Sequence, residues 1–119
     1  MKAALRQLHS PDLPDLENGS PPDPEHFCIL VQAIVGPDDE EDVRESFDFL
    51  LCTPSWLADD LGATPYVWGR HHLLMARYDP ATLTEAVTSI VSEAEGPDWD
   101  AVAAVLSRYG KWEFEDYVE

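Results

Sequence analysis

The chain has 119 residues, with seven lysines and arginines against 24 aspartates and glutamates, and a formal net charge of −17. Seven scattered cations cannot neutralise a run of phosphates, so the composition excludes a nucleic-acid binder and a peripheral binder of anionic membranes. With 45% hydrophobic residues, the chain can bury one core, and its length fits a single domain over residues 1–119. No stretch reaches the roughly 20 apolar residues of a membrane-spanning helix. The absence of a signal-peptide profile and the presence of only two cysteines predict reduced thiols and a cytoplasmic location.

The first third of the chain predicts a strand, a long loop and a hairpin. Residues 2–9 alternate weakly, as in a short strand, and five prolines make residues 10–25 a loop. Residues 26–36 and 43–52 each place apolar side chains at alternate positions. A turn centred near Glu40 would pair odd residues with odd residues and bring Cys28 opposite Cys52. Both apolar faces would then lie on one side of the sheet, as a consistent register requires.

The remainder of the chain predicts three helices and one further strand. A helix begins after Thr53, the second begins at Asp79 and Pro80, and the third follows Pro97; each stops near a glycine. The apolar run within residues 66–78 favours a central strand. The predicted order is β-β-β-α-β-α-α. We therefore expect an α+β fold in which helices cover one face of a mainly antiparallel sheet of about four strands.

The histidines and cysteines do not form a recognisable catalytic or metal-binding pattern. His71 and His72 are adjacent, so on a strand they point to opposite faces and cannot easily share a metal. Neither Cys-x-x-Cys nor His-Glu-x-x-His spacing is present. Cys28 and Cys52 are better explained as small apolar residues packed side by side than as a disulfide or a nucleophile. The sequence thus predicts no catalytic residue, no metal site and no cofactor.

Acidic residues are concentrated in two segments. The first is the uninterrupted run over residues 38–42, and the second is the C-terminal segment 111–119, in which aromatic residues alternate with carboxylates. Such runs are typical of solvated surfaces. Exposed carboxylates are poor general acids, because general acid catalysis needs a buried carboxyl with a raised pKa. In the C-terminal segment we expect Trp112 and Phe114 to face the core, with Glu113, Glu115 and Tyr117 facing outward. Arg70, one of few cations, is expected to pair with carboxylates of the same chain.

Several segments in this order resemble the immunity protein 8 family of bacterial polymorphic toxin systems. They are Met1-Lys2-Ala3 leading to Leu8-His9-Ser10-Pro11, then Ser46-Phe47-Asp48-Phe49, Cys52-Thr53-Pro54-Ser55-Trp56-Leu57, Gly69-Arg70-His71 and Trp112-Glu113-Phe114-Glu115-Asp116-Tyr117. The resemblance spans essentially the whole chain. It implies an inhibitor without enzymatic activity that binds a cognate toxin in the producing cell, and it supplies no catalytic or cofactor residues.

The acidic charge is compatible with that implied function, because an acidic inhibitor can fill the basic cleft of a toxin that cleaves nucleic acid. Two alternatives remain: an acidic adaptor or structural interaction protein unrelated to toxins, and a metal-dependent hydrolase. For the toxin-binding hypothesis we expect the partner-binding residues to come from both acidic segments. They are Asp38, Asp39, Glu40, Glu41, Asp42, Glu113, Glu115, Asp116 and Tyr117.

Overall fold

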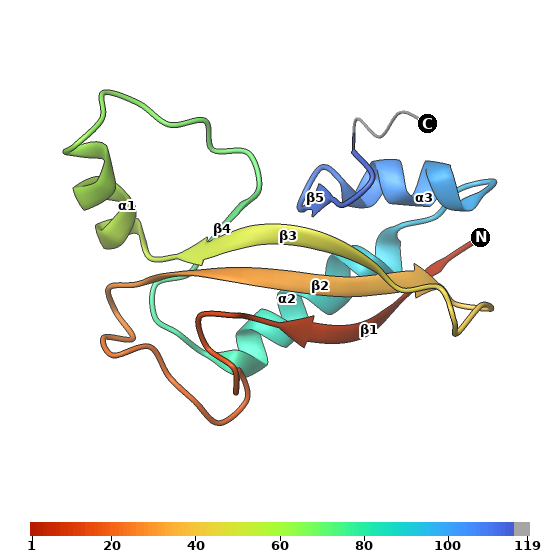
Figure 1. Ribbon diagram of the computed structural model, residues 1–119, viewed down its shortest axis with the longest axis horizontal. Coiled ribbons are helices and arrows are strands. Elements are labelled where there is room, and N and C mark those ends of the chain that lie inside the picture. Colours follow the sequence, from red (N-terminus) through yellow and green to blue (C-terminus); the bar gives the residue numbers. More distant parts are fainter. Residues whose placement is uncertain (116–119) are drawn as a thin grey trace.

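The computed structural model describes residues 1–115 and contains five strands and three helices in that range (Figure 1). The order is β-β-β-α-β-α-α-β, so the predicted order is confirmed and one short strand is added at its end. The elements are β1 (Ala3–His9), β2 (Cys28–Pro37), β3 (Glu45–Cys52), α1 (Pro54–Leu61), β4 (His72–Leu74), α2 (Pro80–Glu93), α3 (Trp99–Leu106) and β5 (Lys111–Trp112).

The sheet is built around β3. β1, β2 and β3 pair antiparallel in that order. Two short strands share the remaining edge of β3: β4 runs parallel to its last residues, and β5 runs antiparallel to its middle. The α+β class and the mainly antiparallel sheet are confirmed, and β4 makes the sheet mixed.

The hairpin of β2 and β3 has the register predicted from its alternating pattern. Cys28 pairs with Cys52, and Val31 pairs with Phe49. Because odd residues oppose odd residues, the apolar side chains of both strands reach the same face. The buried members of this face are Ile29, Val31, Ala33, Val35, Phe47, Phe49 and Leu51.

Two of the three helices contribute buried side chains to this apolar face. α2 supplies Leu83, Val87 and Val91, and α3 supplies Val102, Ala103 and Leu106. In Figure 1, α2 passes behind the strands. All three helices begin where the sequence predicts, and the cap at Thr53 is confirmed. The side chains of Thr53, Asp79 and Asp98 each accept a hydrogen bond from a backbone N–H of the first turn.

The strand predicted from the apolar run within residues 66–78 is present, but it is short and lies at the edge of the sheet rather than at its centre. β4 covers only His72–Leu74, and every residue from 62 to 70 is exposed. The pattern favoured a central position because a short apolar run is typical of a strand buried on both faces. Tyr66 and Trp68, which precede the run, pack edge to face on an exposed loop, with ring centroids 6.4 Å apart.

Candidate partner-binding surface

The acidic run forms the turn that joins β2 to β3, and we call residues 38–42 the acidic turn. All five side chains are exposed. Within residues 1–115, none of the five carboxylates makes a hydrogen bond or an ion pair. The negative charge of the turn is therefore not used to hold the fold together and faces solvent directly.

Backbone contacts at the base of the acidic turn fix its position. The Asp38 N–H donates to the carbonyl of Lys2, and the Arg6 guanidinium donates to the carbonyls of Pro37 and Glu40. A Cβ atom on Gly36 would lie 1.9 Å from the Val43 carbonyl oxygen, so only glycine allows the two sides of the turn to approach this closely. Arg6 thus binds backbone oxygens, and the carboxylates of the turn stay unneutralised.

The C-terminal acidic segment is attached to the start of β3. Glu113 donates its N–H to the Ser46 carbonyl, and its carboxylate accepts the Ser46 N–H at 2.8 Å. Trp112 is half-buried and stacks on Phe47, with ring centroids 6.3 Å apart. The inward orientation expected for Trp112 is confirmed. Phe114 is 40% exposed and contacts Trp112 edge to face, so the inward orientation expected for Phe114 is wrong.

Glu115 pairs with Arg70 across the molecule. The carboxylate side chain is only 19% exposed, whereas the Arg70 side chain is 58% exposed. The expected internal pairing of Arg70 is therefore confirmed. Glu115 is not outward-facing as expected, because it joins the C-terminal segment to the loop that precedes β4. Asp116 and Tyr117, the other two expected partner-binding residues of this segment, lie outside the described residues.

Glu45 is an acidic residue whose role the sequence pattern did not indicate. It is the first residue of β3, and its two carboxylate oxygens accept the indole N–H groups of Trp99 and Trp112, each at 2.8 Å. One half-buried carboxylate thus joins β3, α3 and β5. The residue lies on the odd-numbered, core-facing side of the strand, where a charge requires such partners.

Both acidic segments are connected to the first half of β3. The acidic turn leads into Glu45, and Glu113 binds the next residue, Ser46. Figure 1 shows the turn at one tip of the long hairpin and β5 beside β3. Of the acids in this region, those of the turn are unpaired, while Glu45, Glu113 and Glu115 each satisfy a donor of the protein itself.

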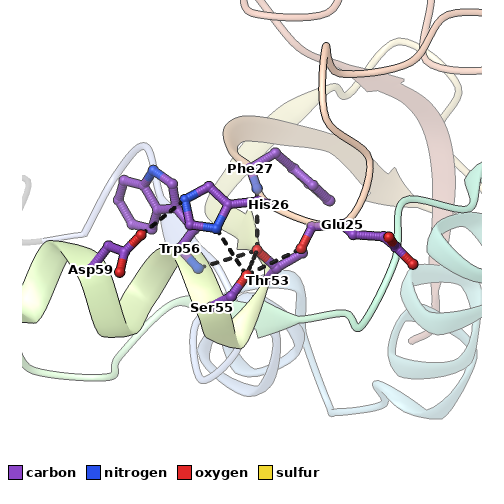
Figure 2. Close-up of polar contacts among 7 residues, drawn as sticks. All are labelled: Glu25, His26, Phe27, Thr53, Ser55, Trp56 and Asp59. Carbon is purple, nitrogen blue, oxygen red and sulfur yellow. Dashed lines mark hydrogen bonds and ion pairs between the residues drawn. The ribbon is translucent and has the colours of Figure 1, made fainter.

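A chain of polar contacts links α1 to the residue before β2 (Figure 2). The His26 Nε2 lies 3.2 Å from an Asp59 oxygen, and the His26 Nδ1 lies 3.0 Å from the Ser55 hydroxyl. Ser55 also donates to the Glu25 carbonyl, and Thr53 accepts the N–H groups of Phe27 and Trp56. These residues are far apart in sequence, so periodicity gave no indication of the cluster.

The Asp59–His26–Ser55 order resembles that of a hydrolytic triad, but the surroundings favour a structural role. The serine proton is directed to the Glu25 carbonyl, at 3.1 Å, rather than to the imidazole. None of the three residues lines the cavity between β1 and α2 or the cavity beside β4 and α2. A nucleophile needs a base that takes its proton and a site for the substrate. The cluster instead ties the proline-rich loop to the start of α1.

His71, His72, Cys28 and Cys52 do not converge on one site. His71 and His72 have separate partners, the carbonyls of Ser107 and Arg70. Among residues 1–115, no group of three His, Cys, Asp or Glu side chains could hold a metal ion. Cys28 and Cys52 face each other as free thiols. Burial, followed by the neighbouring Cys52, raises the pKa of the Cys28 thiol to about 11, so this thiol is a poor nucleophile at neutral pH.

The loop before β4 carries the most exposed aromatic side chains of the described chain. Trp68 is 82% exposed and Tyr66 is 70% exposed, with Val67 between them. Exposed aromatic clusters are common at protein-binding sites, because a buried Trp or Tyr contributes strongly to an interface. The sequence pattern did not indicate this exposure, because aromatic residues next to an apolar run are equally typical of a strand.

These observations define a small acidic α+β domain with unpaired charge on one turn and exposed aromatic residues on one loop. A family model described as Immunity protein 8 matches residues 3–117. The chain therefore belongs to the immunity protein 8 family. Searches of curated proteins and of solved structures found no match. Among the described residues, no helix has the length and apolar character needed to cross a membrane.

Proposed function

We propose that this protein binds a cognate toxin directly and neutralises it without catalysis. Membership of an immunity protein family supplies the class of partner. The observation that carries the finer proposal is the acidic turn, whose five exposed carboxylates have no partner within the described chain. Natural proteins rarely concentrate like charges without a use, because self-repulsion destabilises the compact state.

The proposed toxin presents a basic surface, as a nuclease does where it binds phosphate. The acidic turn and a net charge of −17 would steer such a partner toward one end of the hairpin. Complementary fields raise association rates from about 10⁵–10⁶ to about 10⁸–10⁹ M⁻¹s⁻¹ at low salt. Fast association matters for an inhibitor, because any toxin molecule that remains free is active.

The proposed interface combines steering charges with apolar anchors. Glu113 binds Ser46 near the start of β3, and we include Glu113 and the expected contact residues Asp116 and Tyr117 in this interface. Glu115 contributes by fixing Arg70, which follows the loop that bears Tyr66 and Trp68. Rim charges mainly set the association rate, whereas buried aromatic anchors mainly set the dissociation rate. The two kinds of residue can therefore be tested separately.

Co-expression with the toxin encoded beside this gene tests the proposal as a whole. If it is correct, cells that produce both proteins survive and the two proteins co-purify. Survival must be lost when the immunity protein is absent. If the purified pair forms no complex and the cells die, the proposal is wrong. An acidic adaptor unrelated to toxins would give that result.

Charge reversal tests the role of the acidic turn. The variant Asp39→Lys/Glu41→Lys/Asp42→Lys should associate with the toxin about tenfold more slowly at low salt, with a weaker salt dependence. The variant Glu17→Lys/Asp60→Lys/Glu85→Lys changes the net charge equally at exposed positions outside the turn and serves as the matched control. An association rate that falls equally in both variants would show that net charge, rather than the turn, steers the toxin.

Removal of an aromatic anchor tests the exposed loop. Trp68→Ala should accelerate dissociation of the complex by about tenfold or more and leave the association rate nearly unchanged. Tyr109→Ala is a suitable control, because Tyr109 is also a partly exposed aromatic residue but lies outside the loop. An unchanged dissociation rate for Trp68→Ala would remove the loop from the proposed interface.

A further inference from the structure

A cavity of about 300 Å³ lies where the two short strands share the edge of β3. β5 pairs with Phe47 and Asp48, and β4 pairs with residues 50–52, so the edge passes from one strand to the other at Phe49. Phe49 lines the cavity together with Leu73 of β4 and with Val87 and Ile90 of α2. This volume is at the lower end of the range for small-molecule sites, and its floor is apolar, as is usual for such sites.

The rim of the cavity has the opposite charge to the protein as a whole. Its titratable side chains include Arg70, Arg108, His71 and His72, and no Asp or Glu is among the lining residues that the structure describes. Only seven of the 119 residues are Lys or Arg, whereas 24 are Asp or Glu. The two arginines, with no acidic residue among the described lining residues, therefore give the cavity rim a charge opposite in sign to that of the whole chain.

The cationic groups of the rim retain donors for a ligand. Within residues 1–115, the side chain of Arg108 makes no hydrogen bond or ion pair. Arg70 pairs with Glu115 through one terminal nitrogen, Nη2, which shows that a carboxylate fits beside this guanidinium. An arginine has five N–H donors, so the pair leaves others available.

The segment at the mouth of the cavity is held in an unusual conformation. His71 has a φ of 62°, and it is the only non-glycine residue with a positive φ in the described chain. Its backbone carbonyl accepts the Leu50 N–H at 2.9 Å, and its Nε2 lies 2.8 Å from the Ser107 carbonyl. Because a carbonyl oxygen only accepts, Nε2 carries the proton. These two bonds fix Arg70 and His71 against both β3 and the end of α3, and such strained positions are frequent at ligand sites.

We propose that this cavity binds a small organic carboxylate, with the carboxylate between Arg70 and Arg108 and the hydrocarbon part on the apolar floor. Planar guanidinium groups match carboxylate geometry and form charge-assisted hydrogen bonds. A phosphate is less suitable, because the second negative charge is costly to desolvate beside Phe49 and Leu73. This site is separate from the acidic turn, so it can be tested without the toxin.

A titration of the full chain with phenylacetate, followed by amide chemical shifts, tests the proposal. We expect saturable shifts of the amides at 69–73 and 108–109. Phenylacetamide, which has the same shape without the charge, should bind at least about tenfold more weakly. Absence of saturable shifts at these amides, or equal binding of the two compounds, would overturn the proposal. Tighter binding of phenyl phosphate than of phenylacetate would overturn the assignment to carboxylates.

Arginine variants locate the site. Arg108→Gln should weaken phenylacetate binding by about tenfold, since one charge-assisted contact is lost. Arg44→Gln removes the same charge from an exposed arginine outside the cavity and should leave binding unchanged. If Arg44→Gln weakens binding as much as Arg108→Gln, the carboxylate responds only to net charge, and the site is not the one proposed. Dispersed amide spectra of both variants verify that they are folded.

Discussion

The acidic turn and the C-terminal acidic segment are both rich in acidic residues, but they use their carboxylates in different ways. The five carboxylates of the turn make no hydrogen bond or ion pair within the described chain. By contrast, Glu113 binds the Ser46 N–H, Glu115 binds Arg70, and nearby Glu45 binds two indoles. The count of acidic residues therefore does not indicate how much charge is available to a partner protein. Only carboxylates without partners in the chain itself can interact with it at full charge.

The two segments are also held in place by different contacts. The turn is fixed by its backbone, through Gly36 and the carbonyls that Arg6 binds. The C-terminal segment is fixed by the backbone pairing of β5 with β3 and, in addition, by the side chains of Trp112, Glu113 and Glu115. We therefore expect the acidic turn to be destabilised mainly by substitutions that disturb its backbone, and the C-terminal segment by substitutions of its carboxylates.

The largest effect is expected for Gly36→Ala. The new Cβ would lie 1.9 Å from the Val43 carbonyl oxygen, so the base of the turn must move apart. We expect the free energy of unfolding, measured by urea denaturation, to fall by about 3 kcal/mol or more. Gly110→Ala is the control at the C-terminal segment, where the nearest atoms would be 3.0 Å away and the loss should be smaller. Equal losses in the two variants would contradict the claim that the close backbone approach at Gly36 fixes the position of the acidic turn.

Glu45→Ala should have the next largest effect. The substitution leaves the indole N–H groups of Trp99 and Trp112 without their acceptor. Hydrogen bonds to charged groups contribute about 1.5–3 kcal/mol each. Because Glu45 is only half-buried, water can replace part of what the two indoles lose, and a decrease of about 2–4 kcal/mol in the free energy of unfolding is expected. Glu45→Gln keeps one acceptor oxygen and should lose less. Glu41→Ala, in the acidic turn, should cause almost no loss, and a comparable loss there would refute the distinction between the two segments.

The Arg70–Glu115 pair should contribute less. Because the Arg70 side chain is 58% exposed, solvent screens the attraction. A double-mutant cycle of Arg70→Gln and Glu115→Gln should give a coupling energy below about 1 kcal/mol, which decreases further with added salt. A coupling of several kcal/mol that does not depend on salt would mean that the pair is far more desolvated than the structure indicates.

The smallest effect on stability is expected for neutralisation of the acidic turn. The variant Asp39→Asn/Glu41→Gln/Asp42→Asn removes like charges that make no internal contact. Its free energy of unfolding should be unchanged or slightly higher at low salt, and the difference should vanish at high salt. Marked destabilisation of this variant would show that the carboxylates have structural partners after all.

Local sequence signals predicted much of the fold. Alternating apolar residues fixed the hairpin register, because a shift by one residue would have turned Val31 and Phe49 away from the core. Helix starts were readable from Thr53, from Asp79 and Pro80, and from Pro97, since capping residues and prolines act within the first turn.

The contacts that define the candidate site were less accessible to sequence reasoning. Glu45 reads as one more acid near an acidic run, yet its partners lie 54 and 67 residues away. The contact of His26 with Asp59 depends likewise on where α1 packs. The exposure of Trp68 was missed because an aromatic residue carries the same pattern on a loop as in a strand. Each of these features is set by tertiary packing, which periodicity does not encode.

The arrangement of the sheet edges has a consequence for aggregation. An open strand edge can pair with the edge of another molecule and start a fibril. Here the edge of β3 is covered by β4 and β5, which are only three and two residues long. At the opposite edge, β1 is interrupted by an irregularity between Leu5 and Gln7, beside the charged Arg6. Neither side of the sheet therefore offers the long, regular edge that an intermolecular sheet requires, and the protein can carry an extended β-hairpin at low risk of self-association.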